Sequence, residues 1–214
     1  MIIQKDKPIA FQGEMGANSH IACNDIFPDR DVLPCTTFEG AFKAVENGSA
    51  ALAVLPVENT VAGRVADIHR LLPGYKLYII GEYFMRIRHC LLGLSGASVD
   101  GLTHVRSHEM ALGQCRHIIN ELNLEPVVSA DTAGSAREIA ELNDPALAAI
   151  ASPLAAEING LQIFKENIED AKHNTTRFLV MAPEPDDAEP NSGDVITSFI
   201  FRCRNVPAAL YKAL

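Results

Sequence analysis

The sequence contains no run of Lys or Arg, and its 27 Asp and Glu residues outnumber its 18 Lys and Arg residues, so the formal net charge is −9. Proteins that bind nucleic acid need a basic surface, and this composition therefore argues against that class. A small anionic ligand is still compatible with the composition, because a local basic pocket is enough to hold one.

The sequence also lacks the signals of other protein classes. No apolar run approaches the length of about 20 residues that crosses a bilayer, and the first residues, MIIQKDKPIAFQG, lack the apolar stretch and cleavage site of a secretory signal. No cysteine belongs to a C-x-x-C pair, so neither a zinc site nor a redox motif is indicated. We expect a cytoplasmic protein without a membrane partner. The five cysteines, whose odd number and scattered spacing suit a reducing compartment, are Cys23, Cys35, Cys90, Cys115 and Cys203.

Strand-like and helix-like segments alternate along most of the chain, which predicts an α/β fold with a largely parallel sheet. The extended run at 76–94 contains no helix, and we interpret it as the place where the chain leaves one sheet and enters another. This predicts two lobes, the first formed by about 1–82 and 161–182 and the second by about 83–160. Ligands of open α/β sheets bind beyond the carboxyl ends of the strands.

The last part of the chain has a different character. Residues 183–194, PEPDDAEPNSGD, are rich in Pro and acidic residues and are typical of a linker. After them, VITSFIFRCR predicts a strand, and VPAALYKAL predicts a helix with Pro207 in its first turn. One strand and the start of a helix cannot bury a core. We therefore interpret 195–214 as the opening of a second domain.

Polar residues follow several of the predicted strands. In GEMGANS, residues 13–19, Asn18 and Ser19 are candidate caps of a helix that continues through Phe27, and its N-terminus either faces an anion or is an ordinary capped turn. The G-x-x-G spacing matches neither a dinucleotide nor a Walker loop. In SADTAGSA, residues 129–136, Asp131 or Thr132 caps a second such helix.

Two further clusters lie at strand ends. Glu58, Asn59 and Thr60 follow an apolar strand, where they form part of a ligand pocket or satisfy loop amides. Ser107 and His108 lie between a strand and a helix, and Ser107 is a candidate helix cap or ligand contact. His104 and His108 would bind a metal only on a helix, but the β-branched neighbours of His104 favour an extended chain.

The stretch HNTTRFLVMA, residues 173–182, combines an apolar strand with two hydroxyls and Arg177. A buried arginine is costly unless an anion meets it. The anion is either a ligand or a protein carboxylate such as Glu169 or Asp170. Because side chains alternate along a strand, Thr175 and Arg177 share one face, and Thr176 lies on the other.

Taken together, these stretches resemble prephenate dehydratase. The similarity runs in order over residues 7–182, through GEMGANS, PVENTVAGRV, SHEMALGQC, DTAGSA, AAEINGL and IEDAKHNTTRF. The last is close to the family's N-x-T-R-F signature, formed here by Asn174, Thr176, Arg177 and Phe178. The chain departs from the family's usual Ser-His-Pro-Gln at 107–110 and from Tyr-Gly-Leu at 159–161. The stretch NVPAALYKAL resembles the start of a regulatory ACT domain, with Ala208 where Gly is usual.

The resemblance implies a two-lobed fold like that of type II periplasmic binding proteins, with the active site in the interlobe cleft. It also implies that prephenate loses CO2 and water to give phenylpyruvate, on the route to phenylalanine. Aromatisation drives this reaction, so we expect no metal and no cofactor. Arogenate dehydratase and a non-catalytic sensor of a small anion are the alternatives. L-phenylalanine would regulate only a chain with a complete ACT domain, and we expect a homodimer or homotetramer.

The same resemblance assigns roles to residues. Thr176 assists the leaving hydroxyl, and because its own hydroxyl is a weak acid, the proton comes from Glu58, His108 or water. The residues expected to bind substrate carboxylates or donate hydrogen bonds are Arg177, Asn174, Thr175, Asn59, Thr60, Ser107, Asn18, Ser19, Asp131, Thr132 and Phe178.

Overall fold

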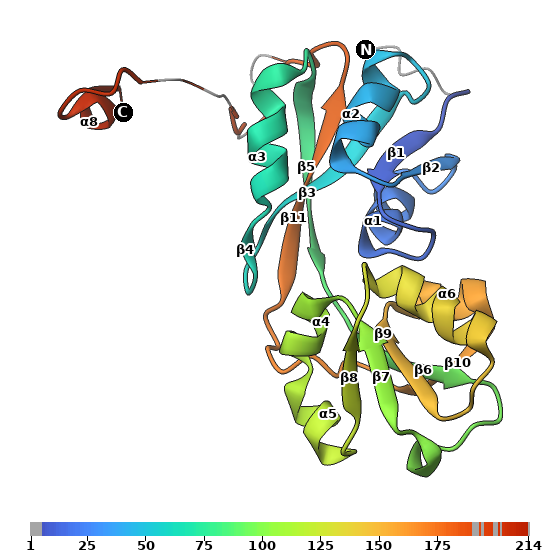
Figure 1. Cartoon of the computed structure of the whole chain (residues 1–214). Coiled ribbons are helices and arrows are strands. Elements are labelled where there is room, and N and C mark those ends of the chain that lie inside the picture. Colours follow the sequence, from blue (N-terminus) through green and yellow to red (C-terminus); the bar gives the residue numbers. More distant parts are fainter. Residues whose placement is uncertain (1–5, 190–192, 194, 199–200, 202, 214) are drawn as a thin grey trace.

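The computed structural model describes residues 6–189, 193, 195–198, 201 and 203–213, and it contains two lobes, each built on a β-sheet with helices (Figure 1). The first sheet has the strand order β2-β1-β3-β11-β5, with β4 paired to β3. Strand β1 is parallel to β2 and β3, whereas β11 is antiparallel to β3 and β5. The strands are β1 (Ile9–Gln12), β2 (Val32–Cys35), β3 (Leu52–Asn59), β4 (Gly63–Arg64), β5 (Tyr78–Arg86) and β11 (Thr175–Ala182).

The second sheet has the order β10-β6-β9-β7-β8 and is also mixed, because β6 is antiparallel to β9 and β10 while β7 is parallel to β8 and β9. The prediction of an α/β fold with two lobes is confirmed, but the prediction of a largely parallel sheet is wrong, because β11 and β10 return to their sheets as antiparallel strands. The strands are β6 (Cys90–Leu94), β7 (His104–Ser107), β8 (Glu125–Val128), β9 (Leu147–Ala151) and β10 (Leu161–Lys165).

The sheets correct the predicted boundaries between the lobes. Strand β5 stays in the first sheet as far as Arg86, so the chain crosses after residue 86 and not at 83. Strand β10 pairs with β6, so 161–165 belongs to the second lobe and not to the first. The reason is that Leu161 is buried in the second lobe's core, with Leu92 and Ile139. Residues 87–89 and 166–174 therefore connect the lobes, and the amide of Ile87 donates to the carbonyl of Asn174 at 2.8 Å.

Both faces of the first sheet are covered, which explains why β11 is apolar from Phe178 to Ala182. Phe178 and Val180 are buried in the core beside α1, whereas Leu179 and Met181 are buried on the opposite face, in the core formed with α2 and α3. Each such side chain contributes roughly 1.5–3 kcal/mol on burial. The helices of this lobe are α1 (Asn18–Ile26), α2 (Phe38–Glu46) and α3 (Ala66–Leu71).

In the second lobe, β9 divides its apolar side chains between two cores. Ala148 and Ile150 pack on the side of α4 and α5, and Ala149 and Ala151 on the side of α6 and α7. The helices are α4 (Glu109–Gln114), α5 (Arg116–Glu121), α6 (Thr132–Leu142) and α7 (Pro153–Asn159). The predicted helix at 110–122 is two helices, because the Asp170 carboxylate accepts from the amides of Arg116 and His117 and thereby begins α5 anew.

The tail was predicted to contain a strand at 195–204. Its described residues form no strand, and Ile200, Arg202 and the residue at 199 lie outside the described part of the chain. The predicted helix is present as α8 (Ala209–Ala213), apart from both lobes in Figure 1, and Pro207 precedes it. Among the helices of the described part, none has the length and apolarity needed to cross a membrane.

Candidate active site

Asn59 and Thr176 lie opposite each other where β3 ends and β11 begins. The side-chain nitrogen of Asn59 donates to the Thr176 hydroxyl oxygen at 2.9 Å and to the Asn174 side-chain oxygen at 2.7 Å. The Asn59 oxygen accepts from the amides of Val61 and Ala62 at 2.9 and 2.7 Å. The Asn59 amide is thus fixed in one orientation, with its NH2 group directed to Thr176.

This arrangement sets the direction of the Thr176 hydroxyl. Its oxygen accepts from Asn59, and among the described residues no acceptor meets its hydrogen. Thr176 is 7 % exposed, so few water molecules reach it. A hydroxyl that already accepts one hydrogen bond has its own hydrogen available to donate. The site therefore presents one oriented, poorly hydrated donor.

Gln114, at the end of α4, continues this network into the second lobe, and the sequence analysis missed it. Its side-chain oxygen accepts from the Asn174 NH2 at 2.9 Å and lies 3.1 Å from Nε2 of His89. Because that oxygen only accepts, Nε2 of His89 carries its hydrogen. Burial lowers the pKa of His89, which favours this neutral form. A glutamine inside an amphipathic segment gives no local signal that separates it from a surface residue.

Thr60 joins the ends of β3 and β11. Its hydroxyl donates to the carbonyl of His173 at 2.7 Å and accepts from the amide of Thr175 at 3.0 Å. Both hydrogen-bonding capacities of the hydroxyl are in use, so Thr60 holds the backbone of the site. Thr175 lies on the opposite face of β11 from Thr176.

Arg177 has a protein partner, but it is neither of the two expected carboxylates. Its Nε and Nη2 atoms lie 2.8 and 2.6 Å from Oε2 of Glu82, and its guanidinium stands 5.9 Å from the ring centre of Phe84. Both partners come from β5, directly beside β11. Glu169 instead lies 3.6 Å from Arg86 and accepts from the amide of His89.

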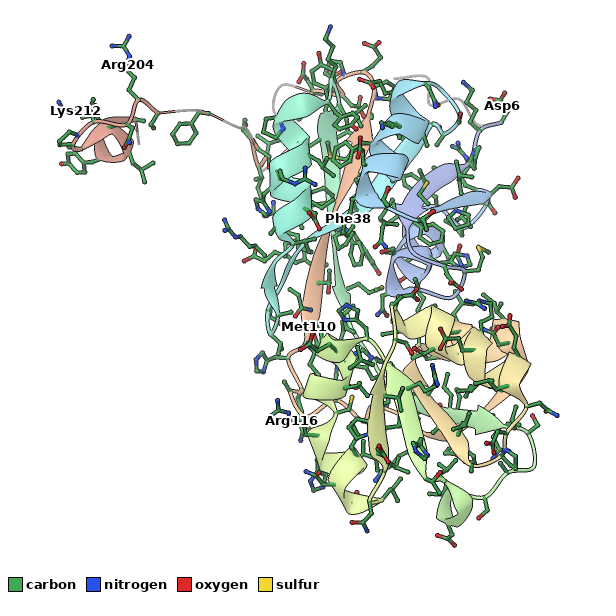
Figure 2. All side chains as sticks on the ribbon, in the orientation of Figure 1. Asp6, Phe38, Met110, Arg116, Arg204 and Lys212 are labelled. Atoms are coloured by element: carbon green, nitrogen blue, oxygen red, sulfur yellow. The ribbon has the colours of Figure 1, made fainter. Side chains whose placement is uncertain are left out.

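The two candidate proton donors, Glu58 and His108, differ in their position relative to the Thr176 hydroxyl. Glu58 is exposed and pairs in register with Arg177 and Arg64, on the face of β3 opposite to Asn59. A direct path from its carboxyl to the Thr176 hydroxyl is therefore blocked by the sheet. His108 precedes α4, and its Nδ1 accepts from the amide of Met110 at 3.2 Å. Met110 is 45 % exposed and lies where the second lobe borders the first (Figure 2).

Ser107 and Phe178 correct two expectations. The side chain that caps α4 belongs to His108, not to Ser107. Ser107 is completely buried because its hydroxyl donates to the carbonyl of Ile150 at 2.6 Å, across to β9. Phe178 is 1 % exposed in the core beside α1, so it cannot contact a substrate in this arrangement.

The two helix N-termini predicted to face anions differ in whether a side chain caps them. Asp131 caps α6 by accepting from the amide of Gly134 at 2.7 Å, so this terminus, where Thr132 begins the helix, already has a carboxylate. Helix α1 follows Ala17 and has no side-chain cap, which corrects the expectation that Asn18 or Ser19 caps it. Among the described residues, the amides of Asn18 and Ser19 have no acceptor, and these are free donors.

Metal sites and reactive thiols are the groups that other kinds of chemistry would need. Within 6–189 and the described parts of the tail, no three His, Cys, Asp or Glu residues gather as metal ligands. Burial raises the pKa of Cys23 to about 12 and that of Cys90 to about 11, and it also raises the pKa of Cys115. These thiols therefore stay protonated near neutral pH.

Comparisons with known proteins show the family to which the chain belongs. A bifunctional N-acyl-homoserine lactone acylase/prephenate dehydratase of Komagataeibacter europaeus is 47 % identical over 98 % of this chain and 74 % of its own length. An arogenate dehydratase/prephenate dehydratase of Arabidopsis thaliana is 40 % identical over 96 % of this chain, which spans 54 % of that relative.

Among solved structures, a quorum-quenching acylase has a TM-score of 0.90 at 47 % identity, covering 97 % of this chain and 75 % of that one. The prephenate dehydratase of Arthrobacter aurescens in complex with L-Phe has a TM-score of 0.81 at 27 % identity, covering 95 % and 69 %. The family model of prephenate dehydratase matches residues 9–186. The chain therefore belongs to the prephenate dehydratase family.

Proposed function

We propose that this chain is the catalytic part of a prephenate dehydratase that converts prephenate to phenylpyruvate in aromatic amino acid biosynthesis. The observation that carries the proposal is the Thr176 hydroxyl, which is buried, accepts a hydrogen bond from Asn59 and has its own hydrogen available. Such a donor suits an oxygen that gains negative charge as it leaves.

The reaction consumes one proton. The bond between the ring and its carboxylate breaks and releases CO2, and its electron pair enters the ring. The bond from C4 to the hydroxyl oxygen then breaks, and this oxygen takes up a proton and leaves as water. The ring becomes aromatic, which supplies the driving force. The side chains need only bind and orient the substrate and donate hydrogen bonds to it. A site built from amides and hydroxyls can do this.

Thr176 acts as the positioned donor to the departing oxygen, and Asn59, Asn174 and Gln114 keep it oriented. Threonine is too weak an acid to supply the net proton near neutral pH. His108 or water fits that role better than Glu58, because Glu58 lies on the other face of β3. The free amides of Asn18 and Ser19 are proposed carboxylate partners. Arg177 binds a substrate carboxylate only when its guanidinium is released from Glu82.

Arogenate is the closest alternative substrate, and the names of the plant relatives include it. Acylase activity is named for the Komagataeibacter relative and for one of the similar solved structures, but no specific contact in this chain favours it. The decisive assay mixes the chain with prephenate and follows phenylpyruvate as its absorbing enolate in alkali, with arogenate and an N-acyl-homoserine lactone in parallel. Turnover of prephenate supports the proposal. Binding of prephenate without turnover would instead identify a sensor.

We further propose that 183–194 is a linker and that 195–214 begins an ACT-like domain. The backbone of Ala208 supports this, because its φ of 61° lies in the left-handed region that favours the glycine usual at this position. L-phenylalanine, the ligand of the Arthrobacter relative, would regulate this protein through a complete ACT domain. We also propose that the protein is cytoplasmic and forms a homodimer or homotetramer.

A further inference from the structure

A contact between the lobes lies away from the connecting segments 87–89 and 166–174. We call it the interlobe clasp, and it consists of Glu14 and Gly16 from the first lobe and Arg137, Ser152 and Ala155 from the second. All the first-lobe atoms come from the loop 13–17 between β1 and α1. Figure 1 shows α1 and α6 next to each other at this border.

The clasp has an ionic part. Nε and Nη2 of Arg137 donate to the two carboxylate oxygens of Glu14 at 2.9 and 3.1 Å, so the fork is bidentate across the lobes. Nη1 of Arg137 also donates to Glu141, one turn further along α6, at 3.0 and 3.1 Å. Arginine suits this geometry because its planar fork matches a carboxylate. The hydrogen bond from Arg137 holds the pKa of Glu14 below its usual range, which keeps this carboxylate charged.

The clasp also has a buried part, formed by Gly16, Ser152 and Ala155. The Ser152 hydroxyl donates to the Gly16 carbonyl and accepts from the amide of Ala155. Ser152 is 1 % and Ala155 0 % exposed. A Cβ on Gly16 would lie 2.7 Å from the Cα of Ala155, so the two backbones touch. This part fits in one arrangement of the lobes only.

That arrangement matters to the site, because the network that orients Thr176 spans both lobes. Asn59 and Thr176 belong to the first lobe, Gln114 belongs to the second, and His89 lies on the connecting segment 87–89. Asn174, between them, lies on a connecting segment. A change in the angle between the lobes would separate Gln114 from Asn174.

We propose that Arg137 is a positioning residue for the dehydratase reaction, whose ion pair with Glu14 holds the loop 13–17 against the second lobe and so maintains the lobes in their binding-competent arrangement. This inference rests on the proposed function. When only a fraction of molecules is competent, the apparent affinity falls by that fraction. Bound substrate then restores the arrangement, so KM changes more than kcat.

The test compares Arg137→Gln, Glu14→Gln and the double variant with the parent 214-residue chain. Exposed ion pairs contribute up to about 1 kcal/mol, so KM for prephenate should rise in each single variant, by at most about fivefold, with kcat within about twofold. The double variant should be no worse than either single one, because both remove the same pair. Arg137→Lys should give an intermediate KM, because it keeps the charge and loses the fork.

Salt and a matched control complete the design. Since salt screens an exposed pair, the ratio of variant KM to parent KM should approach one in about 1 M KCl, where the Debye length is about 3 Å. Lys165→Gln removes a similarly exposed pair, Lys165 with Glu121 at 3.3 Å, which lies wholly within the second lobe. Its KM should equal that of the parent.

Small-angle X-ray scattering provides a readout besides activity, and the radius of gyration should increase in Arg137→Gln but not in Lys165→Gln. An unchanged KM and radius of gyration in both Arg137→Gln and Glu14→Gln would overturn the inference and make the pair an ordinary surface contact. If the parent does not turn over prephenate, the proposed function fails. The increased radius of gyration alone would then still show that the clasp holds the lobes.

Discussion

The side-chain nitrogen of Asn59 donates a hydrogen bond to the hydroxyl oxygen of Thr176, 117 residues away in the sequence, at 2.9 Å. The two residues are cross-strand partners in the antiparallel pair of β3 and β11. This one bond determines which way the Thr176 hydrogen points. The chemistry proposed for the chain depends on it.

Gln114 should be needed to keep this bond in place. In Gln114→Ala the NH2 of Asn174 and Nε2 of His89 lose their acceptor, and unsatisfied buried donors cost about 1–3 kcal/mol each. We expect a lower melting temperature and a kcat that is about tenfold lower, because a disturbed orientation of Asn174 reaches Thr176 through Asn59. Steady-state kinetics and thermal unfolding check this. Gln114→Glu retains the acceptor, and a loss as large as that of the alanine variant would contradict the account.

Arg177→Lys keeps the charge of Arg177 but loses its fork. If Arg177 binds substrate, KM for prephenate should rise about tenfold, in line with the loss of a charge-assisted bond of about 1.5–3 kcal/mol, with the melting temperature nearly unchanged. Glu82→Gln removes the competing carboxylate and should lower KM. Loss of stability in both variants with unchanged KM would show that Arg177 serves only its pairing with Glu82.

Gly16→Ala should destabilise the chain through the interlobe clasp. The φ of Gly16 is +90°, and a Cβ there would meet the backbone of Ala155. Strain and overpacking each cost about 1–3 kcal/mol, which together lower the melting temperature by at least about 4 °C. Gly63→Ala is the control, because Gly63 has a φ of +83° but nothing lies within 4 Å of its Cβ position. Equal losses in the two variants would count against the close contact.

His89 should make stability depend on pH. Burial lowers its pKa in the folded chain, and the same holds for His20. Above about pH 6.5 these groups are neutral in both states, whereas at lower pH the unfolded chain takes up protons that the folded chain does not. Stability should therefore fall as the pH drops below about 6.5, by at most about 1.4 kcal/mol per pH unit for each histidine. Denaturant unfolding of His89→Gln should show a smaller fall, and an equal fall would contradict this assignment.

Much of the fold could be predicted from local sequence. Alternating apolar segments and glycines located the strands and most helices, and the resemblance brought Asn59, Asn174 and Thr176 to one site. What could not be predicted depends on contacts distant in sequence. The position of β10 follows from burial of Leu161 in the second lobe, and the break before α5 follows from Asp170.

The errors at the site have the same origin. Arg177 pairs with Glu82, which no turn connects to it and which only the neighbouring strand brings close. The alternation along β11 correctly separated Thr176 from Arg177, but it could not reveal that Phe178 is covered by α1. Gln114 has no local signal, because its role consists of contacts with Asn174 and His89.

The role of Thr176 is the central claim, and steady-state kinetics of Thr176→Ala with prephenate tests it most directly. Removal of a donor directed at developing charge costs roughly 10²–10³ in turnover, or about 2.7–4 kcal/mol, so kcat should fall by that factor with little change in KM. Thr176→Ser should retain much more activity, and Thr175→Ala should be milder than Thr176→Ala. A Thr176→Ala variant that turns over at nearly the parent rate, at matched stability, would contradict the account.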